Sequence, residues 1–176
     1  MRYLAVDFGA RRIGLAVSDD TGTLASPYAT HERRGTKHDV TAIVDAVRGL
    51  SIQRIVFGLP RALSGGEGTA EAAVRAFAAQ VKTALRAANL PAEIEWWDER
   101  FSTREALGQM RVAGISQRRG REATGSDSVD ARAAAVILQG FLDSRRQMTD
   151  NSAVSAGQSD DMGEWEKISY DEERGK

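Results

Sequence analysis

The alternation of short apolar segments with longer segments of helical periodicity constrains the fold of this chain most. The short segments have the length of strands and are bounded by glycine, proline or acidic turns. They are expected at residues 2–7, 13–18, 23–30, 54–57 and 92–97. The longer segments repeat apolar residues every three or four positions, as helices do. They are expected at residues 36–49, 69–88, 103–112 and 128–142.

The order of these segments predicts a mixed sheet. The first two strands are separated by a short glycine turn, so they are expected to pair antiparallel, and the third strand follows them directly. The later strands alternate with helices, which is typical of parallel neighbours. We therefore expect an α/β fold with a five-stranded sheet. Its first three strands are antiparallel, the others are parallel, and helices flank the sheet.

Residues 1–146 are expected to form one domain, and residues 147–176 an acidic tail. The tail is rich in Ser, Asp, Glu and Gly, so it is expected to be mostly disordered. From Asp150 onward, acids outnumber Lys and Arg by five, whereas in residues 1–149 Lys and Arg outnumber acids by four. A mildly basic domain is compatible with a nucleic-acid partner.

Composition excludes several classes of site. The absence of cysteine excludes disulfides, zinc–thiolate sites, iron–sulfur clusters and cysteine nucleophiles. No apolar run reaches the roughly 20 residues that span a bilayer, and the N-terminus has no signal-peptide pattern. No membrane partner is therefore expected, and the protein is expected to be cytoplasmic. His31 and His38 have no third ligand beside them and are interpreted as surface residues.

Three acids stand at the ends of predicted elements. Asp7 ends the first strand, Glu99 follows the strand at residues 92–97, and Asp130 lies in the first turn of the last helix. Each has a structural alternative. Asp7 can form a turn, Glu99 can pair with Arg100 or Arg104, and Asp130 can cap its helix. Ligands of α/β sheets gather at the carboxyl ends of strands, so the three acids are interpreted as one site.

Converging carboxylates repel one another, and a divalent cation removes that conflict. Oxygen ligands suit Mg²⁺ or Mn²⁺, and two such ions about 4 Å apart can hydrolyse a phosphodiester. Asp7, Glu99 and Asp130 are therefore the predicted catalytic and metal-binding residues, and the expected substrate is a nucleic-acid backbone. Asp127, one turn before Asp130, either joins the metal site or caps the helix.

Arginine suits phosphate because its guanidinium donates two parallel hydrogen bonds. Nine arginines are predicted to bind nucleic acid: Arg11, Arg12, Arg61, Arg100, Arg104, Arg111, Arg118, Arg119 and Arg121. The alternative for the later six is a solvated helix face followed by a polar loop. Since that cluster begins next to Glu99, phosphate binding there would lead the substrate toward the metal.

Four short motifs resemble those of one known family. They are DFG with IGLA within residues 7–16, IVFGLP at 55–60, DERFST at 98–103 and VDARAA at 129–134. In this order they resemble the YqgF/RuvX family of pre-16S rRNA nucleases, also described as Holliday junction resolvases. The resemblance covers about residues 2–143.

This resemblance implies an RNase H-like fold related to the RuvC resolvases, with Asp7, Glu99 and Asp130 as an acidic triad that uses Mg²⁺ or Mn²⁺. It implies maturation of the 5′ end of pre-16S rRNA, with branched DNA as the alternative substrate. Family members occur as monomers and as dimers, so a homodimer is compatible with it. RuvC-type resolvases carry a fourth acid where Asp127 stands here.

Two other classes of function are alternatives. The pattern D-x-G-x-x-x-x-G-x-A at residues 7–16 also matches the first phosphate loop of actin-like ATP-binding proteins. Those proteins need two domains around the nucleotide, whereas one domain is expected here. The other alternative is an inactive nucleic-acid-binding module, which would not need three acids. A P-loop is excluded because G-x-x-x-x-G-K-[ST] is absent.

Overall fold

The structure is a computed structural model that describes residues 1–60, 68–98 and 128–157. Its strands are β1 (Tyr3–Phe8), β2 (Arg12–Ser18), β3 (Ala25–Glu32), β4 (Arg54–Leu59) and β5 (Glu93–Asp98). Its helices are α1 (Thr36–Gly49), α2 (Thr69–Ala87) and α4 (Val129–Gly157). These bounds match the expected elements to within a few residues, apart from the end of α4. The helix expected at residues 103–112 lies outside the described residues.

The five strands form one sheet in the order β3-β2-β1-β4-β5. β1 pairs antiparallel with β2, and β2 with β3, whereas β4 is parallel to both β1 and β5. The predicted mixed sheet is therefore confirmed. Because β1, β4 and β5 run in the same direction, their carboxyl ends meet at one edge of the sheet.

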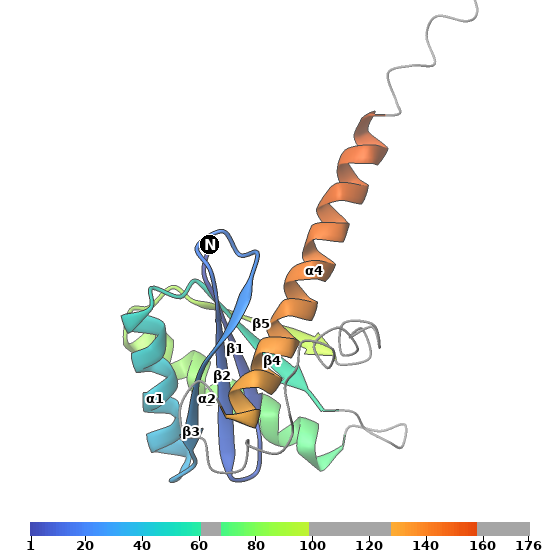
Figure 1. The fold of residues 1–176 in the computed structure, drawn as a ribbon. Helices are drawn as coiled ribbons and strands as arrows, with labels where there is room; N and C mark the ends of the chain where they lie inside the picture. The colour runs from blue at the N-terminus through green and yellow to red at the C-terminus, as the bar shows by residue number, and fades with distance from the viewer. Residues whose placement is uncertain (61–67, 99–127, 158–176) are drawn as a thin grey trace, which may run out of the picture. The chain divides into compact units, whose positions relative to one another are not determined.

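Side chains alternate between the two faces of the sheet, and each face has its own apolar core. Leu4 and Val6 of β1 belong to the core under α1 and α2, whereas Tyr3 and Ala5 belong to the core under α4. Helices α1 and α2 lie side by side on one face, and α4 covers the other (Figure 1). Every second residue of a strand points to the same face, so Asp7 follows Tyr3 and Ala5 on the α4 face.

The face of α4 that meets the sheet begins with small residues. Ala131, Ala134 and Ala135 are buried there, followed by Leu138 and Phe141. The apolar repeat of residues 128–142 predicts that Val129 also faces the core, and that prediction is wrong. The side chain of Val129 is 54% exposed.

Helix α4 continues to Gly157, so its expected end near Leu142 is wrong. The apolar repeat ends after Leu142. A helix predicted from that repeat therefore ends where its buried face ends, although the helix itself continues. Contacts divide the chain after Asp143 into two units, and the packing described here is that of the first. The domain boundary at residue 146 and the disorder of the tail remain predictions. No helix among the described residues is long and apolar enough to cross a membrane.

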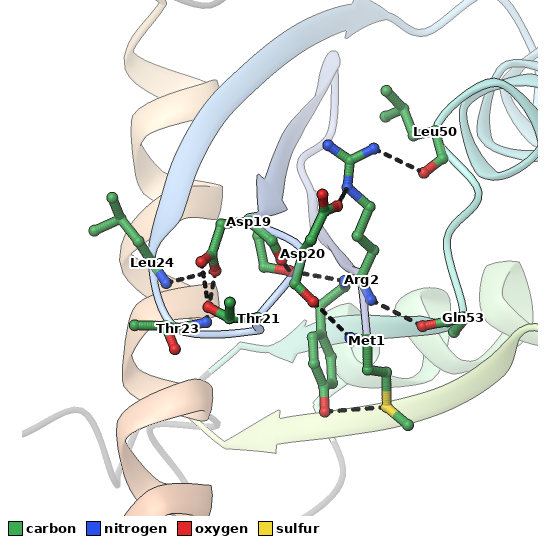
Figure 2. A network of polar contacts seen from close by, with 11 residues as sticks. Met1, Arg2, Asp19, Asp20, Thr21, Thr23, Leu24, Leu50 and Gln53 are labelled. Carbon is green, nitrogen blue, oxygen red and sulfur yellow. Dashed lines mark hydrogen bonds and ion pairs between the residues drawn. The ribbon is translucent and has the colours of Figure 1, made fainter.

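A network of polar contacts holds the end of the sheet at which β1 begins (Figure 2). The backbone N–H of Arg2 donates to the Gln53 Oε1 at 2.9 Å, and its guanidinium donates to the Leu50 carbonyl at 3.2 Å. The same guanidinium forms an ion pair with Asp20 at 2.7 Å. This network therefore joins β1, the end of α1 and the turn after β2 at the edge remote from the carboxyl end of β1.

The turn after β2 is closed by one carboxylate, Asp19 (Figure 2). It accepts hydrogen bonds from the Thr21 hydroxyl and from the backbone N–H groups of Thr23 and Leu24. These donors, the Thr21 hydroxyl first, hold the pKa of Asp19 well below its usual range. Asp19 therefore has a structural role.

Candidate active site

Asp7 is the penultimate residue of β1, and its side chain is half-buried. Tyr3 and Ala5 point to the α4 face, so the alternation of the strand directs Asp7 to the same face. Directly across the β1–β2 pair stands Gly14. The sequence prediction that Asp7 lies near the carboxyl end of a buried strand is thus confirmed in position.

The first turn of α4 lies directly on Gly14. A Cβ atom added to Gly14 would lie 2.0 Å from the backbone carbonyl oxygen of Asp130 and 2.5 Å from its carbonyl carbon. No larger residue fits between the strand and the helix. Gly14 therefore brings the backbone of Asp130 against the strand that pairs with Asp7, and these two acids flank one glycine.

The alternative of helix capping for Asp130 is not what the structure shows. Ser128 caps α4, because its Oγ accepts the backbone N–H of Ala131 at 3.1 Å. The Ser128 hydroxyl also contacts the Thr30 hydroxyl on β3, which ties the start of the helix to the sheet. The Asp130 carboxylate is left to pair with Arg12, with 2.8 Å between Oδ2 and Nε.

The third predicted acid, Glu99, lies outside the described residues. It directly follows Asp98, the last residue of β5, which pairs with Leu59 of β4. Asp127 and the predicted phosphate ligands other than Arg11 and Arg12 also lie outside the described ranges. They are Arg61, Arg100, Arg104, Arg111, Arg118, Arg119 and Arg121.

Arg11 stands in the turn that leads from Asp7 back into β2, and Arg12 is the first residue of β2. The turn is closed by the Gly9 N–H, which donates to the Arg12 carbonyl at 3.0 Å. Arg12 is engaged by Asp130, whereas Arg11 is exposed and has no acidic partner among the described residues. The structure therefore brings Arg12 to the predicted site and places Arg11 beside it.

Sequence reasoning missed Asp39, the buried carboxylate near the start of α1. Its side chain is fully buried, and it contacts the His31 Nε2 at 3.0 Å, the Arg33 Nε at 3.2 Å and the Arg34 backbone N–H at 3.0 Å. Burial opposes ionisation of Asp39, but these donors together outweigh burial and hold its pKa below the usual value. The apolar repeat of residues 36–49 predicts Val40, Ile43, Val44 and Val47 as the buried face of this helix, and it gave no signal for a buried acid.

The guanidinium of Arg33 links Asp39 to the turn after Asp7. It donates to the carbonyl oxygens of Gly9 at 3.2 Å and Ala10 at 3.4 Å. It also lies over the Phe8 ring, 4.2 Å from the ring centre. Arg33 is therefore a positioning residue for the segment that carries Asp7.

His31 is half-buried and bonded to Asp39, so its interpretation as a surface residue is wrong. Together with His38, these residues offer three metal-ligating atoms within 4.8 Å of one another. The site does not favour a cation, however, because Arg33 already neutralises Asp39 and the rings of His31 and His38 are stacked at an interplanar angle of 16°. The nitrogen lone pairs of an imidazole lie in the plane of its ring, so those of His31 and His38 lie in two separate, nearly parallel planes.

Comparison with known proteins gives a consistent result. Residues 1–144 match the family model described as "RuvX: Holliday junction resolvase". A protein of Anaeromyxobacter dehalogenans (strain 2CP-C) named "Putative pre-16S rRNA nuclease" is 43% identical over 145 residues, which are 82% of this chain and 98% of that protein. A protein of Myxococcus xanthus (strain DK1622) with the same name is 36% identical over 146 residues, covering 83% of this chain and 90% of that protein.

Solved structures agree on the fold. The structure entitled "T. thermophilus RuvC in complex with Holliday junction substrate" aligns with a TM-score of 0.53 at 16% identity, covering 83% of this chain and 96% of that chain. A structure of Thermus thermophilus RuvC aligns with the same TM-score at 14% identity. The predicted RNase H-like fold is thereby confirmed.

Proposed function

The chain belongs to the RuvX family, and we propose that it is a metal-dependent nuclease that hydrolyses ribosomal RNA precursors at a site built from Asp7, Glu99 and Asp130. One observation carries the proposal. Gly14 pairs with Asp7 across the sheet and has the Asp130 carbonyl directly over its Cα. The backbones of two acids that are 123 residues apart in the sequence are thus both adjacent to one glycine.

The donor set fits a divalent metal. Asp7 and Asp130 offer carboxylate oxygens, the ligands that Mg²⁺ and Mn²⁺ prefer. The Asp130 carboxylate already attracts a cation, because the Arg12 guanidinium is bound to it and the side chain keeps 29% of its surface exposed. Asp7, Glu99 and Asp130 would hold the metal, one or two ions of Mg²⁺ or Mn²⁺, and Asp127 is a candidate fourth ligand.

Each described residue has a role in this scheme. When bound, the metal would supply an activated water and neutralise charge on the leaving oxygen. Asp7 is fixed by the central strand, so its carboxylate is positioned without a loop rearrangement. Asp130 is held by a backbone contact, and Arg12 can exchange its bond to Asp130 for one to a substrate phosphate.

Precursors of 16S rRNA are the substrate we favour, since relatives at 34–43% identity are named for that activity, and such a role is cytoplasmic. Branched DNA is the second candidate, because the family model carries the name of a Holliday junction resolvase. Symmetrical cleavage of a four-way junction is best done by a dimer, so a homodimer belongs to this second candidate.

The deciding experiment compares Asp7→Asn with the wild-type protein on two labelled substrates, a 5′ precursor fragment of 16S rRNA and a four-way DNA junction. We expect Mg²⁺- or Mn²⁺-dependent cleavage of the RNA by the wild type, and loss of cleavage with retained binding in Asp7→Asn. Asp45→Asn is the matched control, since Asp45 is 63% exposed on α1 and pairs only locally with Arg48. Unchanged cleavage by Asp7→Asn would remove Asp7 from the mechanism.

A further inference from the structure

We propose that the nucleic-acid interface extends from the site onto a basic strip, defined as Arg11, Arg34 and Lys37, that binds backbone phosphates of the substrate. Sequence reasoning singled out Arg11 but neither Arg34 nor Lys37. The inference rests on the proposed function, because the substrate is taken to be a nucleic acid.

The strip is formed by two segments that are far apart in the sequence and adjacent in the fold. The Arg33 backbone N–H donates to the Arg11 carbonyl at 3.0 Å, and the preceding pair is Arg12 with Glu32. The β2–β3 ladder therefore continues into the two connecting segments. Arg11 of the turn after Asp7 and Arg34 of the segment before α1 thus lie at the same edge of the sheet.

The cationic side chains near the strip divide into those that stabilise the fold and those that are available to bind a ligand. Arg33 is used by Asp39 and by the carbonyl oxygens of the turn, and Arg12 is paired with Asp130. Arg11, Arg34 and Lys37 are exposed, and no acidic partner is found for them among the residues that the structure describes. The sequence segments 9–12 and 32–38 contain one acid, Glu32, so the strip keeps an excess of positive charge.

The surface around two of these cations has a shape that admits a phosphate group. An open depression of about 500 Å³ is lined by Arg34, Gly35, Thr36, Lys37, His38 and Thr41. His38 adds an exposed imidazole, and the first turn of α1 lies in the same wall. The ion pair between Arg33 and Asp39, together with the hydrogen bonds from Arg33 to the turn after Asp7, fixes the depression relative to that turn. A polyanion that reaches Asp7 can therefore contact the strip without a change in the fold.

The chemistry of the strip is that of sequence-independent phosphate contacts. Arg and Lys side chains at phosphates fix the register of a nucleic acid and carry no sequence information. Each contact releases a condensed counterion, so affinity falls with salt by a slope of about 0.7 per phosphate contact for single strands and 0.9 for duplex DNA. The strip consequently predicts a measurable part of the salt dependence of binding.

The test measures equilibrium binding in an Asp7→Asn background, which prevents cleavage. The variant Arg34→Gln/Lys37→Gln is compared with Lys82→Gln/Arg86→Gln on labelled precursor RNA and on a four-way DNA junction. Lys82 and Arg86 are exposed on α2, whose last turn lies at the opposite end of the helical layer from the start of α1 (Figure 1). Both variants remove two positive charges, so net charge is matched.

We expect the strip variant to bind about 3–10-fold more weakly at moderate salt and its salt slope to fall by roughly 1–2, whereas the control keeps the wild-type slope. If the strip variant loses affinity equally for the RNA and for the DNA junction, the ligand is the phosphate backbone that both share. If it loses affinity for one substrate only, that substrate supplies the phosphates that the strip binds. An unchanged slope in the strip variant would overturn the proposal. Cleavage by the protein with Asp7 intact is measured separately, so a failure of the proposed function is distinguished from a failure of the strip.

Discussion

The backbone carbonyl oxygen of Asp130 lies 2.0 Å from where a Cβ atom would stand on Gly14. A Cβ atom is fixed by the main chain of its own residue and the carbonyl oxygen belongs to the main chain, so neither can rotate away as the end of a flexible side chain would. The contact between strand β2 and helix α4 therefore fixes the place of Asp130 relative to the strand that carries Asp7.

The first prediction follows from this contact. Gly14→Ala should force α4 away from the sheet and destabilise the protein by at least the roughly 1–3 kcal/mol typical of overpacking. Cleavage should fall further than stability explains, since Asp130 moves. Thermal unfolding and cleavage rates measured on the same preparation check both effects. Gly49→Ala is the control, because nothing lies within 4 Å of its Cβ position; equal behaviour of the two variants would contradict the prediction.

A second prediction concerns competition for Asp130. Arg12 lies 2.8 Å from the carboxylate that we propose as a metal ligand, so Arg12→Gln should remove a competing positive charge. The protein should then bind Mn²⁺ about 3–10-fold more tightly, an order-of-magnitude expectation for one partly exposed charge. Calorimetric titration of Mn²⁺ into the protein without substrate measures this. Arg11→Gln, which changes the neighbouring arginine, should leave Mn²⁺ affinity near that of the wild type; an equal gain in both would point to net charge alone.

The third prediction tests the buried carboxylate of α1. The folded protein holds the pKa of Asp39 below its usual value of 3.8, so Asp39 binds a proton less readily folded than unfolded. Its contribution to stability is present above that usual value and is lost as the pH falls through the lower folded pKa. Asp39→Asn should cost about 1–3 kcal/mol at pH 7, and the difference from wild type should shrink below pH 4.

Urea unfolding of both proteins at pH 7, 5, 4 and 3 measures this difference. Asp45→Asn serves again as the control, since Asp45 is exposed on the same helix. A gap between wild type and Asp39→Asn that stays constant from pH 7 to pH 3 would show that the ionised form of Asp39 does not stabilise the fold.

The fourth prediction separates the geometry of Arg33 from its charge. Arg33→Lys keeps the positive charge but cannot bond Asp39 and the Gly9 and Ala10 carbonyls at once. The turn after Asp7 should loosen, which lowers kcat more than it raises KM and speeds hydrogen exchange of the Gly9 amide. Arg48→Lys is the matched control, because Arg48 is exposed on α1 and pairs with Asp45 within the same helix. If both variants exchange the Gly9 amide at the wild-type rate, Arg33 does not position this turn.

Much of the architecture could be predicted from the sequence because the apolar repeat within each segment matches the face that the segment buries in the fold. The helix at residues 36–49 was predicted with its true bounds, since its apolar stripe, Val40, Ile43, Val44 and Val47, is also its buried face. The strand at residues 54–57 was predicted too short, because Gly58 signals a turn locally. In the fold, Gly58 continues the strand, and a Cβ there would meet the Ile137 side chain at 2.7 Å.

The residues of the site were predictable only where their role follows from their position in a single strand or helix. Asp7 was identifiable because it interrupts an apolar run at a strand end. Asp39 was not, since an acid near the start of a helix is usually an exposed partner of the helix dipole. Its burial depends on His31 of β3 and on Arg33, which directly follows that strand, and no local pattern encodes these contacts. The position of Glu99 remains a prediction.

Where the first turn of α4 crosses Gly14, main chain lies against main chain, whereas the rest of the core under α4 holds large side chains such as Trp97 and Phe141. This contact has no side-chain volume to rearrange, whereas the apolar side chains of the core under α1 and α2 can absorb substitutions by shifting rotamers. Sequence drift under α1 and α2 should therefore leave the distance between Asp7 and Asp130 nearly constant. Side-chain volumes on one side of the sheet can therefore change during evolution while the acidic residues on the other side keep their spacing.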